Sequence, residues 1–188
     1  MSRNRAIPLL ACFVAASAMA AADHVIDFEK GSPGWTYYGG FEFPGATGSI
    51  ATTRESAREG KQALRLSGDF SGGGRYVAAT CALPEGTPCL GLRFWVRTTD
   101  VDSIGIRIVD SGGQTFQFTR QLTRKDAWQE VVLQDITEPK VVWGGAGDKV
   151  FHQPAASCSF TVGVGPKKTT ALLLDAVQVL GAPAAAKR

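Results

Sequence analysis

An alternation of apolar and polar residues with a period of two runs through most of the chain, and clusters of Gly, Pro, Asp and Ser interrupt it. Successive side chains of a β-strand point to opposite faces, so this period predicts strands that bury one face. No run keeps a helical period over three turns. The pattern predicts an all-β fold, a sandwich or jelly roll. The strand-length runs are 51–54, 61–67, 76–83, 90–98, 104–110, 115–122, 128–134, 159–165 and 171–180, with a hairpin turn at 110–114.

The first residues have the pattern of a secretory signal peptide. Arg3 and Arg5 precede an apolar stretch, and small residues follow it. We therefore expect a signal peptide over 1–22 and a secreted or periplasmic protein. A lipoprotein modified at Cys12 is the less favoured alternative, because few apolar residues precede that cysteine.

The remainder is long enough for one domain with a sizeable core. We expect a β-sandwich over 23–181 and a disordered tail over 182–188. No later apolar run approaches the roughly 20 residues that span a bilayer, so no membrane span is expected. The formal net charge is only +3 and the basic residues are scattered, which argues against nucleic acid as a partner.

Export would place the cysteines in an oxidising compartment. The three that lie beyond the signal peptide, Cys81, Cys89 and Cys158, allow a single disulfide. Cys81 and Cys89 flank a turn-like segment, so we favour this pair, although the parity of the strand faces would then require a bulge. A bridge from either of them to Cys158 stays open. The absence of a C-x-x-C pattern argues against zinc and thiol redox chemistry.

Several expected strands carry polar and aromatic residues opposite their apolar face. Arg93 and Trp95 lie on one such face, and Arg107 lies on the next. If these strands are neighbours in a meander, Gln117 joins them in one platform around a tryptophan. A flat ring beside planar hydrogen-bonding groups suits a sugar, which has an apolar C–H face and a rim of hydroxyls. The plainer alternative is a solvated face.

Other aromatic residues are candidates for the rim of a site. Many rings crowd the Gly- and Pro-rich segment 35–43, where they either plug an edge of the sandwich or contact a ligand. Trp143 lies in a Gly-rich segment, which we expect to be a loop at the lip of a site. Tyr76 is a further candidate.

Acidic residues lie in an apolar strand at each end of the expected domain, with Asp27 and Glu29 at its start and Asp175 near its end. A buried carboxylate is costly without a partner, and neither strand offers an obvious cation. We therefore expect the two ends to meet, with a bound calcium ion between them.

Short motifs are spread over nearly the whole expected domain, at 27–29, 60–64, 83–84, 92–98, 128–133 and 174–177. Together they resemble the galactose-binding-like β-sandwich, and in particular carbohydrate-binding modules of family 11 and neighbouring families. Each motif is short and shared by many such domains. The resemblance therefore predicts a fold better than it predicts a ligand.

The resemblance implies both a metal site and a sugar site. A structural calcium in such modules would here be held by Glu29, Asp175 and the backbone carbonyls of Asp27 and Lys61, and would stabilise the fold without contacting ligand. The alternative is that the two carboxylates cap turns or meet Lys61 without metal. The sugar site of such modules lies on one concave sheet. Here Tyr38 and Tyr76 fall near two tyrosines of the family, and the neighbourhood of Arg107, Asp110 and Gln117 falls on the relevant strands.

The resemblance has limits. The segment 141–145 departs from the family pattern, and His152 has no clear counterpart, so specificity for β-glucan is not carried over. Catalysis is not expected, because neither His24 nor His152 belongs to a recognisable catalytic motif and no carboxylate pair can be assigned across a cleft.

We expect a secreted, non-catalytic module that binds a polysaccharide or a cell-surface glycan. Trp95 or Trp143 would stack on the sugar, and Arg93 or Arg107 would donate paired hydrogen bonds. The alternative is an interaction or assembly module that docks a protein partner of the cell envelope on the same surface.

Overall fold

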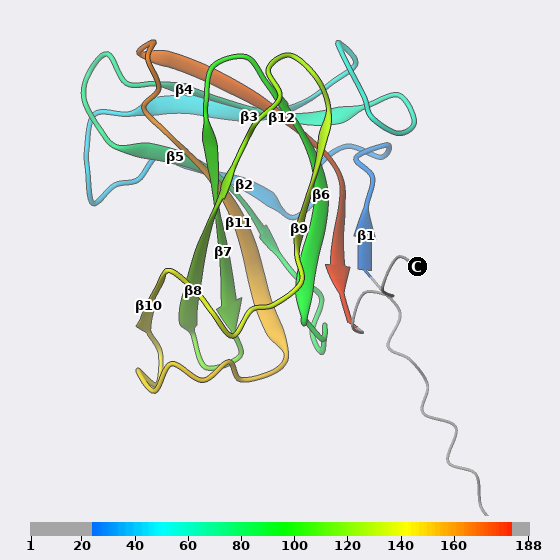
Figure 1. Ribbon diagram of the computed structural model, residues 1–188, viewed down its shortest axis with the longest axis vertical. Coiled ribbons are helices and arrows are strands. Elements are labelled where there is room, and N and C mark those ends of the chain that lie inside the picture. The colour runs from blue at the N-terminus through cyan, green and yellow to red at the C-terminus, as the bar shows by residue number, and fades with distance from the viewer. Residues whose placement is uncertain (1–23, 182–188) are drawn as a thin grey trace, which may run out of the picture.

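The computed structural model describes residues 24–181, which form twelve strands and no helix. The strands are arranged in two antiparallel sheets that pack face to face (Figure 1). This confirms the predicted all-β sandwich. The predicted signal peptide and tail lie outside the described residues. Within the described residues no helix has the length and apolar character required to cross a membrane.

Sheet A has the strand order β3-β4-β12-β6-β9, with β1 paired to β12 beside β4. The first half of β12 pairs with β4, and its second half pairs with β1. The first and last strands of the described chain are therefore neighbours, as expected. The strands are β1 (His24–Ile26), β3 (Thr47–Thr53), β4 (Ala63–Asp69), β6 (Gly91–Thr98), β9 (Gln129–Leu133) and β12 (Thr169–Leu180).

Sheet B has the strand order β10-β8-β7-β11-β5-β2. The hairpin turn predicted at 110–114 joins β7 to β8, and there the Asp110 carbonyl accepts a hydrogen bond from Gly113 N at 3.1 Å. The strands are β2 (Trp35–Tyr38), β5 (Tyr76–Ala82), β7 (Ser103–Asp110), β8 (Gln114–Gln121), β10 (Val141–Gly144) and β11 (Ala155–Gly163).

Aromatic rings from both sheets meet in the core. Phe94 of β6 and Phe160 of β11 contact edge to face, with ring centroids 4.7 Å apart. Phe160 also stacks on Trp35 of β2 at 5.9 Å, and Trp35 contacts Phe28 at 5.4 Å. Because the apolar set of each strand is used in this core, the alternate set must face outward.

The predicted meander is wrong. β6 lies between β12 and β9 in sheet A, whereas β7 and β8 are neighbours in sheet B (Figure 1). Arg93 and Trp95 therefore lie on the outer face of sheet A, and Arg107 and Gln117 lie on the outer face of sheet B. The single platform predicted from these four residues is divided between opposite sides of the molecule.

The three cysteines of the described chain are buried free thiols. Cys81 of β5 and Cys158 of β11 are directly opposite each other in the ladder, and Cys89 precedes β6. The structure thus does not support the favoured bridge between Cys81 and Cys89. Burial raises the pKa of each of these two thiols to about 11, which makes them poor nucleophiles near neutral pH.

Candidate ligand-binding face

A row of side chains crosses the outer face of sheet B from edge to edge. Six strands spaced by about 4.8 Å give this row a length of roughly 24 Å. Apart from Gln117 and Arg107 the row carries small or β-branched side chains, so the floor of the face is shallow. In register from β10 to β2 the row consists of Val141, Gln117, Arg107, Ser159, Thr80 and Thr36.

Arg107 is the centre of a chain of hydrogen bonds on this face. Its Nε donates to Gln117 Oε1 at 2.8 Å, and its Nη1 donates to the hydroxyl of Tyr76 at 2.9 Å. The Tyr76 hydroxyl in turn donates to Glu42 Oε1. Tyr38 donates to the other oxygen of Glu42 at 2.9 Å. We call these five residues the Arg107 network.

The charges of the Arg107 network are balanced. A hydrogen bond from Tyr76 is the main cause that lowers the pKa of Glu42, so this group is a carboxylate near neutral pH. Burial, with the bond to Glu42, raises the pKa of Tyr76 to about 12 and keeps it a phenol. The Arg107 bonds to Gln117 and Tyr76 use two of five guanidinium N–H groups, which leaves donors for a ligand.

Aromatic rings flank the Arg107 network on both sides. On the β10 side, Trp143 is 42% exposed and its ring centroid lies 5.3 Å from the Arg107 guanidinium carbon. On the β2 side, Tyr38 contacts Phe41 edge to face at 5.0 Å, and Phe41 is 74% exposed. The face therefore combines central polar donors with exposed rings at its sides.

A glycine permits the close approach of the segment that carries Glu42. Gly40 has a φ of 61°, and a Cβ at this position would lie 2.7 Å from the backbone oxygen of Tyr76. Any other residue would push this segment away from β5. Gly40 thus helps to bring the Glu42 carboxylate to Tyr76.

Five of the eight sugar-site residues predicted from the sequence lie together on this face. They are Tyr38, Tyr76, Arg107, Gln117 and Trp143. The other three do not join them. Arg93 lies on sheet A with Glu130, at 3.5 Å, and Trp95 lies there under the guanidinium of Arg58, at 4.1 Å.

The third of these, Asp110, has a fully buried side chain. Its carboxylate accepts backbone N–H bonds from Gly112 at 2.9 Å, from Gln114 at 2.8 Å and from His152 at 3.1 Å. It closes the β7–β8 turn and presents no surface to a ligand. The sequence prediction that Asp110 contacts sugar therefore lacks a geometric basis.

Glu42 is the residue of the Arg107 network that sequence reasoning missed. The sequence signal for Glu42 is an acidic residue between Phe41 and Phe43, in a segment whose pattern is dominated by aromatic rings. Its role arises from contacts with Tyr38 and Tyr76, which come from two different strands.

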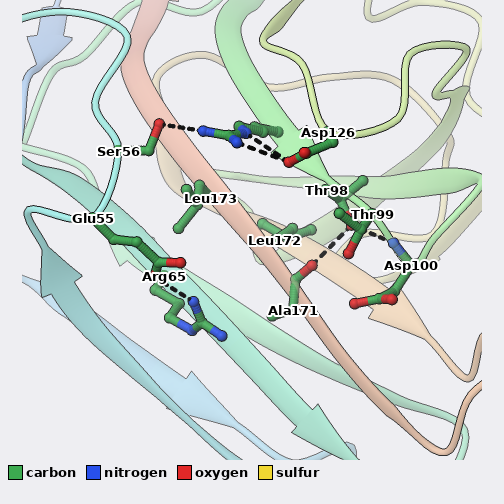
Figure 2. A pocket seen from close by; sticks show the side chains of 11 residues that line it. Glu55, Ser56, Arg65, Thr98, Thr99, Asp100, Asp126, Ala171, Leu172 and Leu173 are labelled. Atoms are coloured by element: carbon green, nitrogen blue, oxygen red, sulfur yellow. Dashed lines mark hydrogen bonds and ion pairs between the residues drawn. The ribbon is translucent and has the colours of Figure 1, made fainter.

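The outer face of sheet A contains a pocket of about 220 Å³ (Figure 2). Arg97 crosses it, donating to Asp126 Oδ1 at 2.8 Å and to the hydroxyl of Ser56 at 2.7 Å. Arg65 pairs with Glu55 at 2.8 Å across the same pocket. The arginines of this pocket are thus bound by the chain's own side chains.

The acidic residues at the two ends of the domain bind one segment, the connection between β3 and β4. Asp175 of β12 is fully buried, and its Oδ2 accepts the backbone N–H groups of Arg58 at 2.7 Å and Glu59 at 3.0 Å. Glu29, which follows β1, accepts the N–H groups of Lys61 and Gln62, both at 2.8 Å.

These bonds bear on the predicted calcium site. The buried carboxylate of Asp175 requires a partner, and backbone N–H groups supply one. Glu29, Asp175 and nearby carbonyls still offer the hard oxygen atoms that calcium prefers. In the described part of the chain, no group of three or more His, Cys, Asp or Glu side chains could hold a metal. A calcium site would therefore depend on two carboxylates and backbone carbonyls.

No protein-family model matches the chain, and no curated protein sequence matches it. Solved structures do. A family 11 carbohydrate-binding module from Clostridium thermocellum, in complex with a β-1,3-1,4-mixed-linked tetrasaccharide, has a TM-score of 0.62 and 16% identity over 85% of this chain and 96% of that one. The family 11 module of a cellulosomal cellulase from the same organism has a TM-score of 0.63 and 15% identity, over 87% and 97%.

A cleaved adhesin domain of Lys-gingipain from Porphyromonas gingivalis is also similar, with a TM-score of 0.54 and 14% identity over 84% of this chain and 97% of that one. These likenesses establish the fold: the chain is a β-sandwich of the kind found in family 11 carbohydrate-binding modules. The resemblance predicted from the short motifs is confirmed at the level of fold.

Proposed function

We propose that this protein is a non-catalytic module that binds a glycan on the outer face of sheet B. The observation that carries the proposal is the Arg107 network between exposed rings. A pyranose can stack its C–H face on Trp143 while its hydroxyls accept hydrogen bonds from the free guanidinium N–H groups of Arg107. The shallow floor and its length suit several sugar units that run across the strands.

The proposal extends to the setting of the protein. Export by the predicted signal peptide would bring the module to extracellular or envelope polysaccharides. A structural calcium held by Glu29, Asp175 and the carbonyls of Asp27 and Lys61 would join the two ends of the domain to the β3–β4 connection. The ion would lie apart from the Arg107 network, so we propose a role in stability.

The calcium proposal has a direct test. The purified protein is analysed for bound metal and melted with calcium and with a chelator. Bound calcium and a lower Tm in chelator are expected. An unchanged Tm without bound metal would leave the backbone N–H groups as the partners of Glu29 and Asp175.

The binding proposal is tested by retention on a panel of soluble and insoluble polysaccharides. Saturable retention on one class is expected for the parent protein, and Arg107→Ala should lose it. Arg65→Ala is the matched control, because it removes an arginine from the opposite face, where an exposed ion pair contributes little to stability. Equal losses in both variants would contradict the assignment of the face.

A second candidate is docking of a protein partner on the same face. Exposed Phe41 and Trp143 favour it, since exposed rings are common in protein interfaces. It predicts that no polysaccharide of the panel retains the parent protein and that Trp143→Ala abolishes capture of one defined envelope protein.

A further inference from the structure

Arg107 differs from the outward arginines of sheet A in having no carboxylate partner. The three arginines on the outer face of β4 and β6 each form an ion pair: Arg65 with Glu55, Arg93 with Glu130 and Arg97 with Asp126. Within residues 24–181 Arg107 forms no ion pair, and its bonds go to the uncharged Gln117 and Tyr76. The Arg107 guanidinium is therefore a half-buried cation without an anion in direct contact.

The hydrogen bonds within the Arg107 network leave N–H donors at its centre. Tyr38 and Tyr76 both give their phenol hydrogen to Glu42, so neither hydroxyl has a hydrogen left for a ligand. Among the bonds of the described chain, three guanidinium N–H groups of Arg107 and the amide N–H groups of Gln117 are unused. A sugar hydroxyl both donates and accepts, whereas a carboxylate only accepts. The centre of the face therefore suits a carboxylate.

Glu42 is the carboxylate of this network, and it would repel an anionic ligand. Its two oxygens accept the two phenol hydrogens, and the Tyr76 hydroxyl lies between Glu42 and Arg107. A ligand carboxylate in direct contact with Arg107 would be closer to the guanidinium than to Glu42, and Coulomb energy falls with distance. Because two N–H groups can also bind the two ligand oxygens at once, attraction to Arg107 outweighs the repulsion by Glu42.

The exposed ring of Trp143 lies beside these unused donors. Its centroid is 5.3 Å from the guanidinium carbon of Arg107, and the residue is 42% exposed. In a uronic acid the carboxylate is attached directly to the pyranose ring. A uronic acid that stacks its ring on Trp143 can therefore bring its carboxylate to Arg107.

We propose that the glycan bound on sheet B is acidic, with a uronic acid whose ring stacks on Trp143 and whose carboxylate accepts two N–H groups of Arg107. The inference rests on the proposed glycan-binding function and names the class of glycan. Losing the charge-assisted bonds to the carboxylate should lower affinity by at least about tenfold. Because the pair is partly exposed to solvent, affinity should also fall as the salt concentration rises.

The first measurement compares glycans that differ only at C6. β-1,4-Glucuronan, β-1,4-mannuronan and α-1,4-galacturonan are each used as such and after reduction of their carboxylates to primary alcohols. The parent protein should bind at least one uronan, and bind its reduced form at least about tenfold more weakly. Equal binding of the two forms, or retention only on neutral polysaccharides, would overturn the inference and leave glycan binding standing. Retention on none of these ligands and on none of the wider panel would overturn both.

The second measurement locates the carboxylate with variants whose Tm shows that they are folded. Arg107→Gln should bind the uronan and its reduced form equally, because the partner of the carboxylate is gone. Arg107→Lys keeps the charge but not the planar set of donors, so its preference for the uronan should be intermediate. Arg65→Gln makes the matched change on sheet A and should behave as the parent. An Arg107→Gln variant that prefers the uronan by the same factor as the parent would overturn the inference.

Discussion

The two outer faces of the sandwich carry similar side chains and differ in what those side chains contact. On sheet A, Arg97 pairs with Asp126 at 2.8 Å, and Trp95 lies under a guanidinium of the β3–β4 connection. On sheet B, Arg107 donates only to uncharged groups, and Trp143 is 42% exposed. The arginine and tryptophan of sheet A are held by contacts within the fold, whereas those of sheet B keep unused guanidinium N–H groups and an exposed ring.

An outward Arg and Trp in a strand therefore do not define a site by themselves. The long connection between β3 and β4 lies over sheet A and is bound by Asp175 and Glu29. On sheet B the segment that follows β2 reaches the Arg107 network only through Glu42, which bonds to Tyr76 and Tyr38. The two faces differ in whether their arginine N–H groups remain available as hydrogen-bond donors. This depends on which connections between strands lie over each face.

The largest expected effect is on stability, from Asp175→Ala on the sheet A side. Three backbone N–H groups, those of Arg58, Glu59 and Ala176, would lose their acceptor, and about 3 kcal/mol of unfolding free energy should be lost. Denaturant unfolding measures this, and glycan affinity of the folded fraction should not change. A variant as stable as the parent would show that Asp175 does not hold the connection.

Arg107→Ala should have the largest effect on binding. It removes the central donors of the sheet B face and leaves Glu42 without its opposite charge. We expect affinity to fall by about thirtyfold, the loss typical of an interface hot spot. Isothermal titration calorimetry measures it, with Arg65→Ala as the control on sheet A. An Arg65→Ala variant that binds as weakly as Arg107→Ala would show that the two faces do not differ in ligand binding.

Trp143→Ala tests whether the exposed ring on sheet B contributes to binding. The ring is exposed, so its loss should change Tm little while affinity falls by about tenfold. Trp95→Ala is the counterpart on sheet A, where the ring is covered by Arg58 and its loss should lower Tm with little change in affinity. The opposite result in the two variants would place the ligand on sheet A.

Much of the fold follows from the period of the sequence. Nine of the twelve strands match runs of alternating residues. The other three, β1, β2 and β10, have only three or four residues each, which is too few to establish a period. The pairing of β6 with β12 and β9 is set by long connections, and nothing in the local sequence of β6 determines it.

The candidate site was predictable in part, for similar reasons. Arg107 and Gln117 are outward residues on two strands joined by a tight hairpin, and local sequence suffices to pair them. The prediction that Arg93 joins them is wrong, because β6 pairs with β12 and β9, which lie far away in the sequence. Glu42 could not be recognised, because its two tyrosine partners belong to different strands.

The smallest effect expected is from Glu42→Gln. The pKa of Glu42 is lowered, so its carboxylate contributes stability above its unfolded-state pKa, and that contribution is lost as the pH falls through the lower folded-state pKa. Thermal melting should show the parent slightly more stable at neutral pH. The difference should shrink as the pH falls below the usual 4.5 of glutamic acid. A constant difference would mean that the charge of Glu42 plays no part.

Glycan binding on the outer face of sheet B is tested most directly by a residue-resolved NMR titration of the parent protein. The ligand is an oligosaccharide from the polysaccharide that retains the protein. Saturable shifts are expected at the side chains of Arg107 and Gln117 and at the Trp143 indole, with Trp95 and Arg97 unchanged. Shifts confined to Trp95 and Arg97 would place the site on sheet A and contradict the account.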